Sequence, residues 1–291
     1  MNIGFIGLGS LGTPIAENLL EKHPSIYLYN RTISKTISLG EKGGIVCNTV
    51  SEVAKNADLV FSIVSDDSAL KEIVEGQNGL AVNLKPGGIH VSISTILPAT
   101  ARKLEQLHSQ NKNHYIAAPV MGRPEAAKNR KLNFLVSGSP AVIGEIKPIL
   151  YDAGAAGVWD FGTEVSAANA AKLCSNFLIA SAIESMSEGI QLAKNSGIDA
   201  TRWLTMLTQT LFPSPVYQNY GNILLGETYL PAGFQLKLGL KDMDLVRRQS
   251  VETRTVMPFG EKILELFHKG VEKGLGEHDW TAVALVNQKD R

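Results

Sequence analysis

The sequence lacks the features that mark secreted, membrane and nucleic-acid-binding proteins. Its two cysteines, Cys47 and Cys174, form no Cys-x-x-Cys pair, which predicts reduced thiols rather than a disulfide framework or a zinc site. No apolar run reaches the roughly 18 residues of a membrane span, and no secretory signal pattern opens the chain. Lys plus Arg and Asp plus Glu each number 28, so no net charge favours nucleic acid or an anionic membrane. We therefore expect a cytoplasmic protein that binds neither.

The composition that remains is typical of a folded enzyme. Of the 291 residues, 44% are hydrophobic and 19% are charged, which argues against disorder. A chain of this length is expected to form about two domains. The six histidines are scattered, and no two of them fall at the spacing of metal ligands, so we expect no metal.

The first half of the chain alternates segments with the patterns of strands and helices. Apolar or β-branched runs predict strands at 2–7, 25–30, 59–64, 88–93, 114–117, 133–137 and 157–161. Helical patterns lie between most of them, as at 11–22, 98–110 and 140–151. This alternation implies right-handed crossovers, and therefore an α/β, Rossmann-type, doubly wound sheet.

The second half has the patterns of helices. Residues 164–195 contain no proline and only one glycine, Gly189, which predicts one long helix. Further helices are expected at 199–209, 235–251 and 258–273, with no convincing strand. We therefore expect two domains: 1–162, an α/β domain, and 163–291, an all-α domain built on the long helix.

A glycine-rich loop follows the first expected strand and precedes a helix. Its sequence, Gly7-Leu8-Gly9-Ser10-Leu11-Gly12, fits the G-x-G-x-x-G pattern in the context of a dinucleotide-binding unit. Gly7 permits the tight turn, Gly9 lets the backbone approach a pyrophosphate, and Gly12 lets helix and strand pack closely. The helix N-terminus then faces the phosphates. We expect the cofactor to contact the whole loop.

The residues after the second strand indicate which dinucleotide binds. NAD-preferring sites usually carry Asp or Glu there for the ribose 2′-hydroxyl, whereas this chain has Asn30, Arg31 and Thr32. Arg31 can pair with a 2′-phosphate, and its two neighbours can donate hydrogen bonds to it. Because such bonds contribute about 1.5–3 kcal/mol each, we expect NADPH to be preferred by roughly tenfold or more.

Short motifs follow one another along nearly the whole chain. They are the opening GFIGLGSLGTPIAENLL, Ser94-Thr95-Ile96, Pro119-Val120-Met121-Gly122, Lys172 with Asn176, and Lys241-Asp242. In this order they resemble the β-hydroxyacid dehydrogenase family, which includes 3-hydroxyisobutyrate dehydrogenases and glyoxylate/succinic semialdehyde reductases. The resemblance implies that 1–162 is an NADP-binding Rossmann-type domain and that 163–291 is a helical domain for substrate binding and dimerisation. It also implies hydride transfer with NAD(P) and a homodimer or homotetramer.

The resemblance also implies roles for the motif residues. Lys172 and Asn176 are implied as the catalytic pair. Besides the glycine loop and residues 30–32, the expected cofactor contacts are Val64, Ser65, Thr95 and Lys241. The expected substrate contacts are Ser94, Thr95, Met121, Gly122, Arg123 and Asn176.

Six positions depart from the family pattern, among them Ser166 and Ala168, which replace glycines that often precede the lysine. Ser92 and Ala118 stand where the family usually has aspartate, Met121 where it has serine, and Arg123 where it has a second glycine. The lysine is kept, so the departures affect the substrate more than the chemistry. The natural substrate, the direction of the reaction and the roles of Met121 and Arg123 stay open.

The chemistry explains why a lysine is useful here. Reducing a carbonyl adds hydride to carbon and leaves charge on oxygen, which a positioned ammonium can protonate. Lys172 and Asn176 are four residues apart and share one helix face, so Asn176 can hold the substrate. We therefore expect an NADP(H)-dependent oxidoreductase acting on a small β-hydroxy acid or its semialdehyde or keto acid, with reduction favoured.

Two alternatives have different consequences. Imine reductases share this architecture but typically replace the lysine, so Lys172 counts against that activity. A catalytically silent, NADP-binding redox sensor would be expected to have lost Lys172 or Asn176, and both are present.

Overall fold

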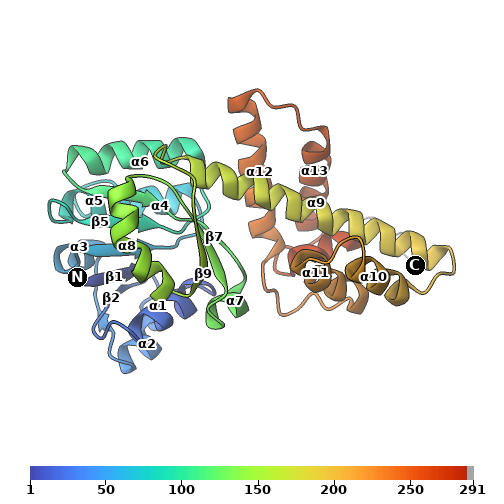
Figure 1. Cartoon of the computed structure of the whole chain (residues 1–291), viewed down its shortest axis with the longest axis horizontal. Coiled ribbons are helices and arrows are strands. Elements are labelled where there is room, and N and C mark those ends of the chain that lie inside the picture. Colours follow the sequence, from blue (N-terminus) through green and yellow to red (C-terminus); the bar gives the residue numbers. More distant parts are fainter. Residues whose placement is uncertain (287–291) are drawn as a thin grey trace. The chain divides into compact units, whose positions relative to one another are not determined.

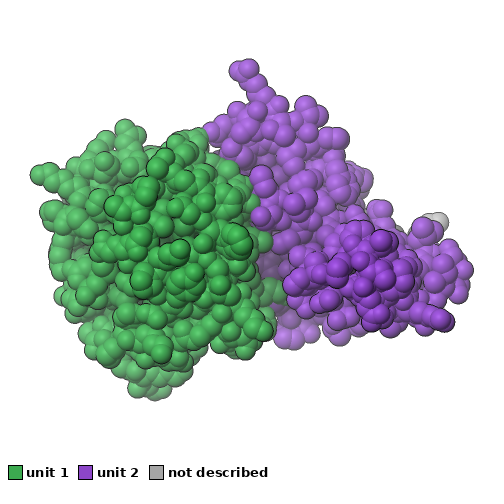
Figure 2. All heavy atoms as spheres, in the orientation of Figure 1, with its two compact units in different colours: residues 1–172 green, residues 173–291 purple. Residues whose placement is uncertain are grey.

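The computed structural model describes residues 1–286 and divides the chain into two compact units, Met1–Lys172 and Leu173–Arg291 (Figures 1 and 2). The division falls inside the long helix α9 (Ala167–Asn195). The domain boundary expected between residues 162 and 163 stays a prediction. In the part of the chain that the structure describes, no helix is both long and apolar enough to cross a membrane.

The first unit is built on a six-stranded sheet with the order β3-β2-β1-β4-β5-β6. Every neighbouring pair in it is parallel. The strands are β1 (Ile3–Ile6), β2 (Tyr27–Tyr29), β3 (Ile45–Val46), β4 (Leu59–Ser62), β5 (Ile89–Ser92) and β6 (His114–Ala117). The structure thus confirms the expected doubly wound, Rossmann-type sheet.

Successive side chains of the buried strands point to opposite faces of the sheet, and each face forms an apolar core. Phe5 and Phe61 pair across β1 and β4 with ring centroids 6.3 Å apart, on the face covered by α1 (Gly12–Leu20) and α8 (Pro140–Asp152). Ile6 and Val60 lie on the opposite face. That face is covered by α3 (Val50–Asn56), α4 (Asp67–Val74), α5 (Leu80–Asn83) and α6 (Pro98–Gln110). Both faces are therefore buried, which explains why these strands are continuous apolar runs.

A small second sheet completes the first unit. It has the order β7-β8-β9, with β7 (Val120–Met121), β8 (Leu132–Val136) and β9 (Ala155–Asp160). The short helix α7 (Pro124–Lys128) links β7 to β8. The sequence predicted β8 and β9 but missed β7 and β3, because two residues are too few to show a period. Between β2 and β3 lie the short helices η1 (Ile33–Thr36) and α2 (Ile37–Glu41).

The second unit is helical, as expected. After α9 come α10 (Ala200–Gln209), α11 (Pro215–Gly226), α12 (Leu236–Thr253), α13 (Pro258–Glu272) and the 3₁₀ helix η2 (Trp280–Leu285). α9 and α10 pack closely, because a Cβ at Gly189 would lie 2.7 Å from the Trp203 ring. Helix α11 was not expected: its prolines suggested a turn, whereas Pro215 occupies the first helical turn, where proline is tolerated.

Candidate functional site

Backbone contacts fix the conformation of the glycine loop. Gly7 has φ +100°, and a Cβ there would lie 2.0 Å from the carbonyl oxygen of Ile63. A Cβ at Gly12 would lie 2.0 Å from the carbonyl oxygen of Gly7. At Gly9, by contrast, no atom of the described residues would lie within 4 Å of an added Cβ, so this side of the loop is open. Two glycines therefore serve packing, and the third leaves space for a ligand.

The loop is braced by the residue that ends β2. The Leu8 N–H donates to the side-chain oxygen of Asn30 at 2.9 Å, and the Asn30 amide donates to the Thr32 carbonyl at 2.8 Å. Asn30 therefore supports the loop, a role that the sequence did not indicate. Arg31 and Thr32 follow it and are exposed. They remain accessible to a ligand at this corner.

The ends of β4 and β5 form the other side of this region. The Val64 N–H donates to the Ser94 hydroxyl oxygen at 2.8 Å, across the two strand ends. Ser94 is only 1% exposed, so the structure gives it a bracing role and does not support direct contact with substrate. Ser65 is exposed, and its hydroxyl donates to Asp66 at 2.7 Å. Thr95 is half-buried beside them.

These segments meet where a dinucleotide is expected to bind. The strand order reverses between β1 and β4, and ligands of doubly wound sheets bind at the carboxyl ends of strands beside such a switch point. The N-terminus of α1 has no side-chain cap from any described residue, so its N–H groups suit phosphate. With the open space at Gly9, the residues fit an NAD(P) molecule.

The predicted substrate segment lies on β7 and the start of α7. Gly122 has φ +143°, and Arg123 is the half-buried N-cap of α7. The Lys172 ammonium donates to the Met121 sulfur at 3.4 Å. The structure therefore brings together two motifs that are 51 residues apart in sequence.

A second pair of motifs meets in the helical unit. The Asn176 amide donates to one carboxylate oxygen of Asp242 at 2.6 Å, and the Lys241 ammonium lies 2.7 Å from the other. Asn176 and Asp242 are both buried. The sequence gave no sign of the bond between Asn176 and Asp242, because the two helices are distant in sequence.

Buried titratable groups elsewhere in the first unit are neutral. The Ser62 hydroxyl contacts His90 at 2.7 Å, and His90 contacts His108 at 3.0 Å. Burial lowers the pKa of His108 to about 4 and holds the pKa of His90 well below its usual range. Neither ring is accessible, so this cluster is structural. Among the described residues, no group of three or more His, Cys, Asp or Glu side chains is placed to hold a metal ion.

Comparison with known proteins identifies the family. Residues 2–168 match the family described as the NAD binding domain of 6-phosphogluconate dehydrogenase. Residues 166–286 match the family described as NAD-binding of NADP-dependent 3-hydroxyisobutyrate dehydrogenase. Together these matches span both units.

Curated relatives and solved structures agree with these matches. The uncharacterized oxidoreductase YfjR of Bacillus subtilis is 38% identical, over 97% of this chain and 98% of its own. Glyoxylate/succinic semialdehyde reductase 1 of Arabidopsis thaliana is 29% identical, over 97% of each chain. The solved structure of Psf3 in complex with NADP+ and 2-OPP is 25% identical, with a TM-score of 0.88 over 98% and 100%. The chain therefore belongs to the β-hydroxyacid dehydrogenase family and is an NAD(P)-binding oxidoreductase that acts on hydroxyl groups.

Proposed function

We propose that the protein is an NADP(H)-dependent reductase of a small semialdehyde or keto acid, yielding the β-hydroxy acid, with Lys172 as the general acid. The contact of Lys172 with Met121 carries this proposal. It sets an ammonium, a group that can protonate an alkoxide, against the segment expected to hold the substrate.

The cofactor preference rests on the residues after β2. Arg31 is exposed at the corner that follows Asn30, and the backbone there is held by the Asn30 bonds. A guanidinium matches the geometry of a phosphate, whereas residues 30–32 include no carboxylate to bind a free 2′-hydroxyl. Further cofactor contacts are proposed at the ends of β4 and β5, from Val64, Ser65 and Thr95. Lys241 stays a proposed cofactor contact.

The proposed chemistry divides between cofactor and protein. The nicotinamide, when bound, supplies the hydride in reduction and accepts it in oxidation. Lys172 donates a proton to the carbonyl oxygen in reduction, and its neutral amine takes that proton back in oxidation. Asn176 lies one turn further along α9, on the same helix face, and orients the substrate. Its bond to buried Asp242 fixes that amide.

The substrate is proposed to carry a carboxylate. Arg123 is a half-buried cation two residues after Met121, and a guanidinium can bind a carboxylate through two hydrogen bonds. The relative named glyoxylate/succinic semialdehyde reductase acts, by its name, on such aldehyde acids. Solved imine reductases share the fold, with TM-scores of 0.64 to 0.67. Lys172 favours a carbonyl over an imine substrate.

We also propose that the protein forms a homodimer or homotetramer through its helical unit. Leu178 and Leu192 lie on one side of α9, about four turns apart, and are 65% and 68% exposed in the single chain. The homo-oligomer that the family resemblance implies would cover these two side chains with another copy. Light scattering should give a mass of at least two chains, and a mass of one chain would overturn this proposal.

The decisive experiment is NADPH consumption with a panel of carbonyl compounds. The panel contains glyoxylate, succinic semialdehyde, methylmalonate semialdehyde, tartronate semialdehyde and cyclic imines. We expect turnover of at least one aldehyde acid, and Lys172→Ala should cut kcat by about 10² or more while NADPH affinity is kept. Lys194→Ala, on the same helix but in a surface ion pair with Glu227, is the matched control and should leave kcat unchanged.

The outcomes separate the competing functions. Near-normal turnover in Lys172→Ala would remove the proposed role of the lysine. Turnover of imines alone would assign the protein to the imine reductases. NADPH binding without turnover of any compound would favour the redox sensor. The cofactor preference is tested with Arg31→Gln. Loss of the guanidinium should lower the ratio of NADPH affinity to NADH affinity by about tenfold.

A further inference from the structure

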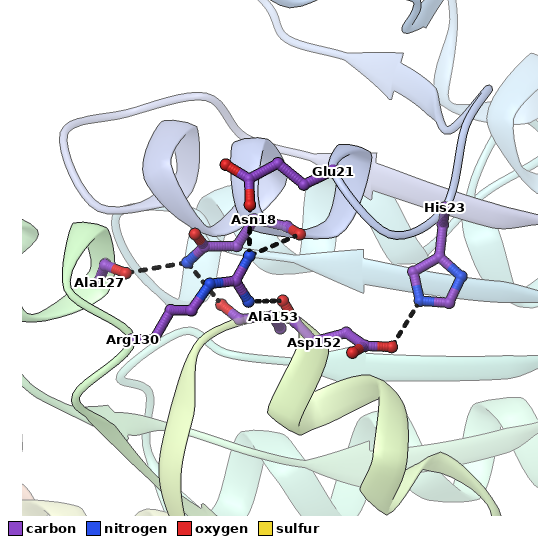
Figure 3. Close-up of polar contacts among 7 residues, drawn as sticks. All are labelled: Asn18, Glu21, His23, Ala127, Arg130, Asp152 and Ala153. Atoms are coloured by element: carbon purple, nitrogen blue, oxygen red, sulfur yellow. Dashed lines mark hydrogen bonds and ion pairs between the residues drawn. The ribbon is translucent and has the colours of Figure 1, made fainter.

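A polar junction joins three segments of the first unit away from the cofactor loop (Figure 3). It lies at the second half of α1, the end of α7 and the turn between α8 and β9. Its members are Asn18, Glu21, Ala127, Arg130, Asp152 and Ala153, which we call the α1–α7 junction. Neither the cofactor proposal nor the lysine proposal uses it.

Asn18 is the buried centre of this junction. It is 5% exposed, and its amide donates to the Ala127 carbonyl at 2.9 Å and to the Ala153 carbonyl at 3.3 Å. A Cβ at Gly154 would lie only 2.6 Å from the Asn18 amide nitrogen, so the chain passes tightly around it. A buried amide that donates to two different segments fixes both relative to its own helix.

Arg130 closes the junction from the outside. Its guanidinium donates to the Asp152 carbonyl at 3.0 Å and to the Asn18 carbonyl at 3.4 Å, and pairs with Glu21 at 2.7 Å. Figure 3 shows the guanidinium lying against Asn18 between α1 and the end of α8. A separate contact, His23 to Asp152 at 2.9 Å, ties the chain after α1 to α8.

The two ends of this connection are the two ligand-facing parts of the first unit. Asn18 lies six residues after Gly12, or about 9 Å along α1 from the helix end that faces the cofactor. Ala127 donates its N–H to the Arg123 carbonyl at 3.2 Å, within the one-turn helix α7 that begins after the substrate segment. A single side chain therefore connects the cofactor helix with the short helix that carries Arg123.

We propose that Asn18 is a positioning residue that sets the substrate segment, residues 121–123, relative to the cofactor helix. This inference rests on the proposed function, because it assumes that the segment binds substrate. Helix α7 has only five residues, so its orientation depends on its contacts, which include the packing of the buried Ala127 side chain and the bond of the Ala127 carbonyl to Asn18. A shift of about 1 Å between reacting groups costs about 10² in rate, so such a link matters for turnover.

The test compares two buried asparagines in the same unit. Asn18→Leu removes the donor while keeping the branched shape and the number of side-chain heavy atoms, and the Ala127 carbonyl keeps its bond from the Arg130 N–H at 3.1 Å. Asn113→Leu is the matched control, since Asn113 is also buried and donates to a helix carbonyl, that of Ala81, at 2.8 Å. Both variants should lower the melting temperature by similar amounts. Only Asn18→Leu should lower kcat/KM for the carbonyl substrate, by about tenfold, with the Kd of NADPH within about twofold of wild type.

A less disruptive variant tests the same junction with a smaller risk of misfolding. Arg130→Met removes the guanidinium but leaves Asn18 in place, and it should lower kcat/KM by about threefold. Glu21→Gln removes only the exposed ion pair and should have no effect. Equal losses of kcat/KM in Asn18→Leu and Asn113→Leu would overturn the proposal. A rise in the Kd of NADPH that matches the fall in kcat/KM would also overturn it, because Asn18 would then support the cofactor helix alone.

Hydrogen exchange separates this inference from the proposed function. Asn18→Leu should speed amide exchange in residues 121–128 more than elsewhere, whereas Asn113→Leu should act on α5. Unchanged exchange at 121–128 would refute the positioning role even if the enzyme turns over aldehydes. Faster exchange there, in a protein that reduces no carbonyl, would keep the physical link and reject only the proposed function.

Discussion

The cofactor loop, residues 7–12, and the substrate segment, residues 120–123, are held in place by different interactions. In the loop, the backbone itself leaves no room for side chains at Gly7 and Gly12. In the segment, the pairing of β7 with β8 is supplemented by side chains brought from far along the chain, Lys172 on Met121 and Asn18 on the Ala127 carbonyl. Conformation set by backbone contacts tolerates few residue types, whereas side-chain contacts allow substitution. The comparison predicts larger losses from substitutions in the loop than from substitutions in the segment.

The largest effect should come from adding one methyl group to the loop. In Gly12→Ala the new methyl would meet the Gly7 carbonyl oxygen at 2.0 Å and the Ile63 side chain at 2.8 Å, so the loop backbone would have to shift. We expect a clear fall in melting temperature and a rise in the Kd of NADPH by about 100-fold or more. Calorimetry and fluorescence titration of NADPH measure the two effects.

Gly9→Ala tests the same comparison with the fold intact. No described atom lies within 4 Å of the added methyl, so the melting temperature should stay at the wild-type value. The Kd of NADPH should still rise by about tenfold, because the methyl would occupy the space proposed for the pyrophosphate. An unchanged Kd would show that the phosphates bind elsewhere, and the loop would then serve packing alone.

The same comparison explains which features could be predicted from sequence. The glycine loop was predictable because its spacing encodes a backbone conformation, and the strands because both sheet faces are apolar. The roles of Asn30 and Ser94 were not, since both side chains bond to backbone N–H groups of other loops. Nor was the contact of Asn176 with Asp242, which depends on how α9 and α12 pack.

A smaller effect is expected from restoring a hydroxyl in the substrate segment. Met121 presents a thioether to Lys172, so a substrate hydroxyl at this place would lose hydrogen bonds to water without replacement. In Met121→Ser, the preference for tartronate semialdehyde over methylmalonate semialdehyde should rise by about fivefold to tenfold. Ratios of kcat/KM for the two substrates measure it.

Met121→Leu is the control for that substitution. It keeps an apolar side chain of similar volume and should leave the substrate ratio within about twofold of wild type. A ratio that changes equally in the serine and leucine variants would mean that the fit of residue 121, and not its polarity, selects the substrate. The substrate segment would then resemble the cofactor loop in being governed by shape.

The smallest effect concerns the buried histidines beneath the cofactor loop. Ser62 is the last residue of β4, and the carbonyl of the next residue, Ile63, leaves no room for a side chain at Gly7. The Ser62 hydroxyl contacts the His90–His108 pair. Burial lowers the pKa of His108 to about 4, whereas an unfolded histidine titrates near 6.5. The unfolded chain therefore binds protons first as the pH falls, so stability is full above about pH 6.5 and declines toward pH 4.

The decline should be modest near neutrality and should come from the buried histidine rings. One such histidine lowers the free energy of unfolding by about 0.7 kcal/mol between pH 7 and pH 6, roughly threefold in the unfolding equilibrium. His90 shifts in the same direction, and the neighbouring Tyr115 stays neutral because burial raises its pKa. Urea unfolding across this range should show the loss in wild type and in His114→Gln, which alters an exposed ring, but less of it in His108→Gln. Equal slopes of unfolding free energy against pH in all three proteins would mean that another group titrates. Apolar packing and backbone contacts alone would then account for the stability of the cofactor side of the unit.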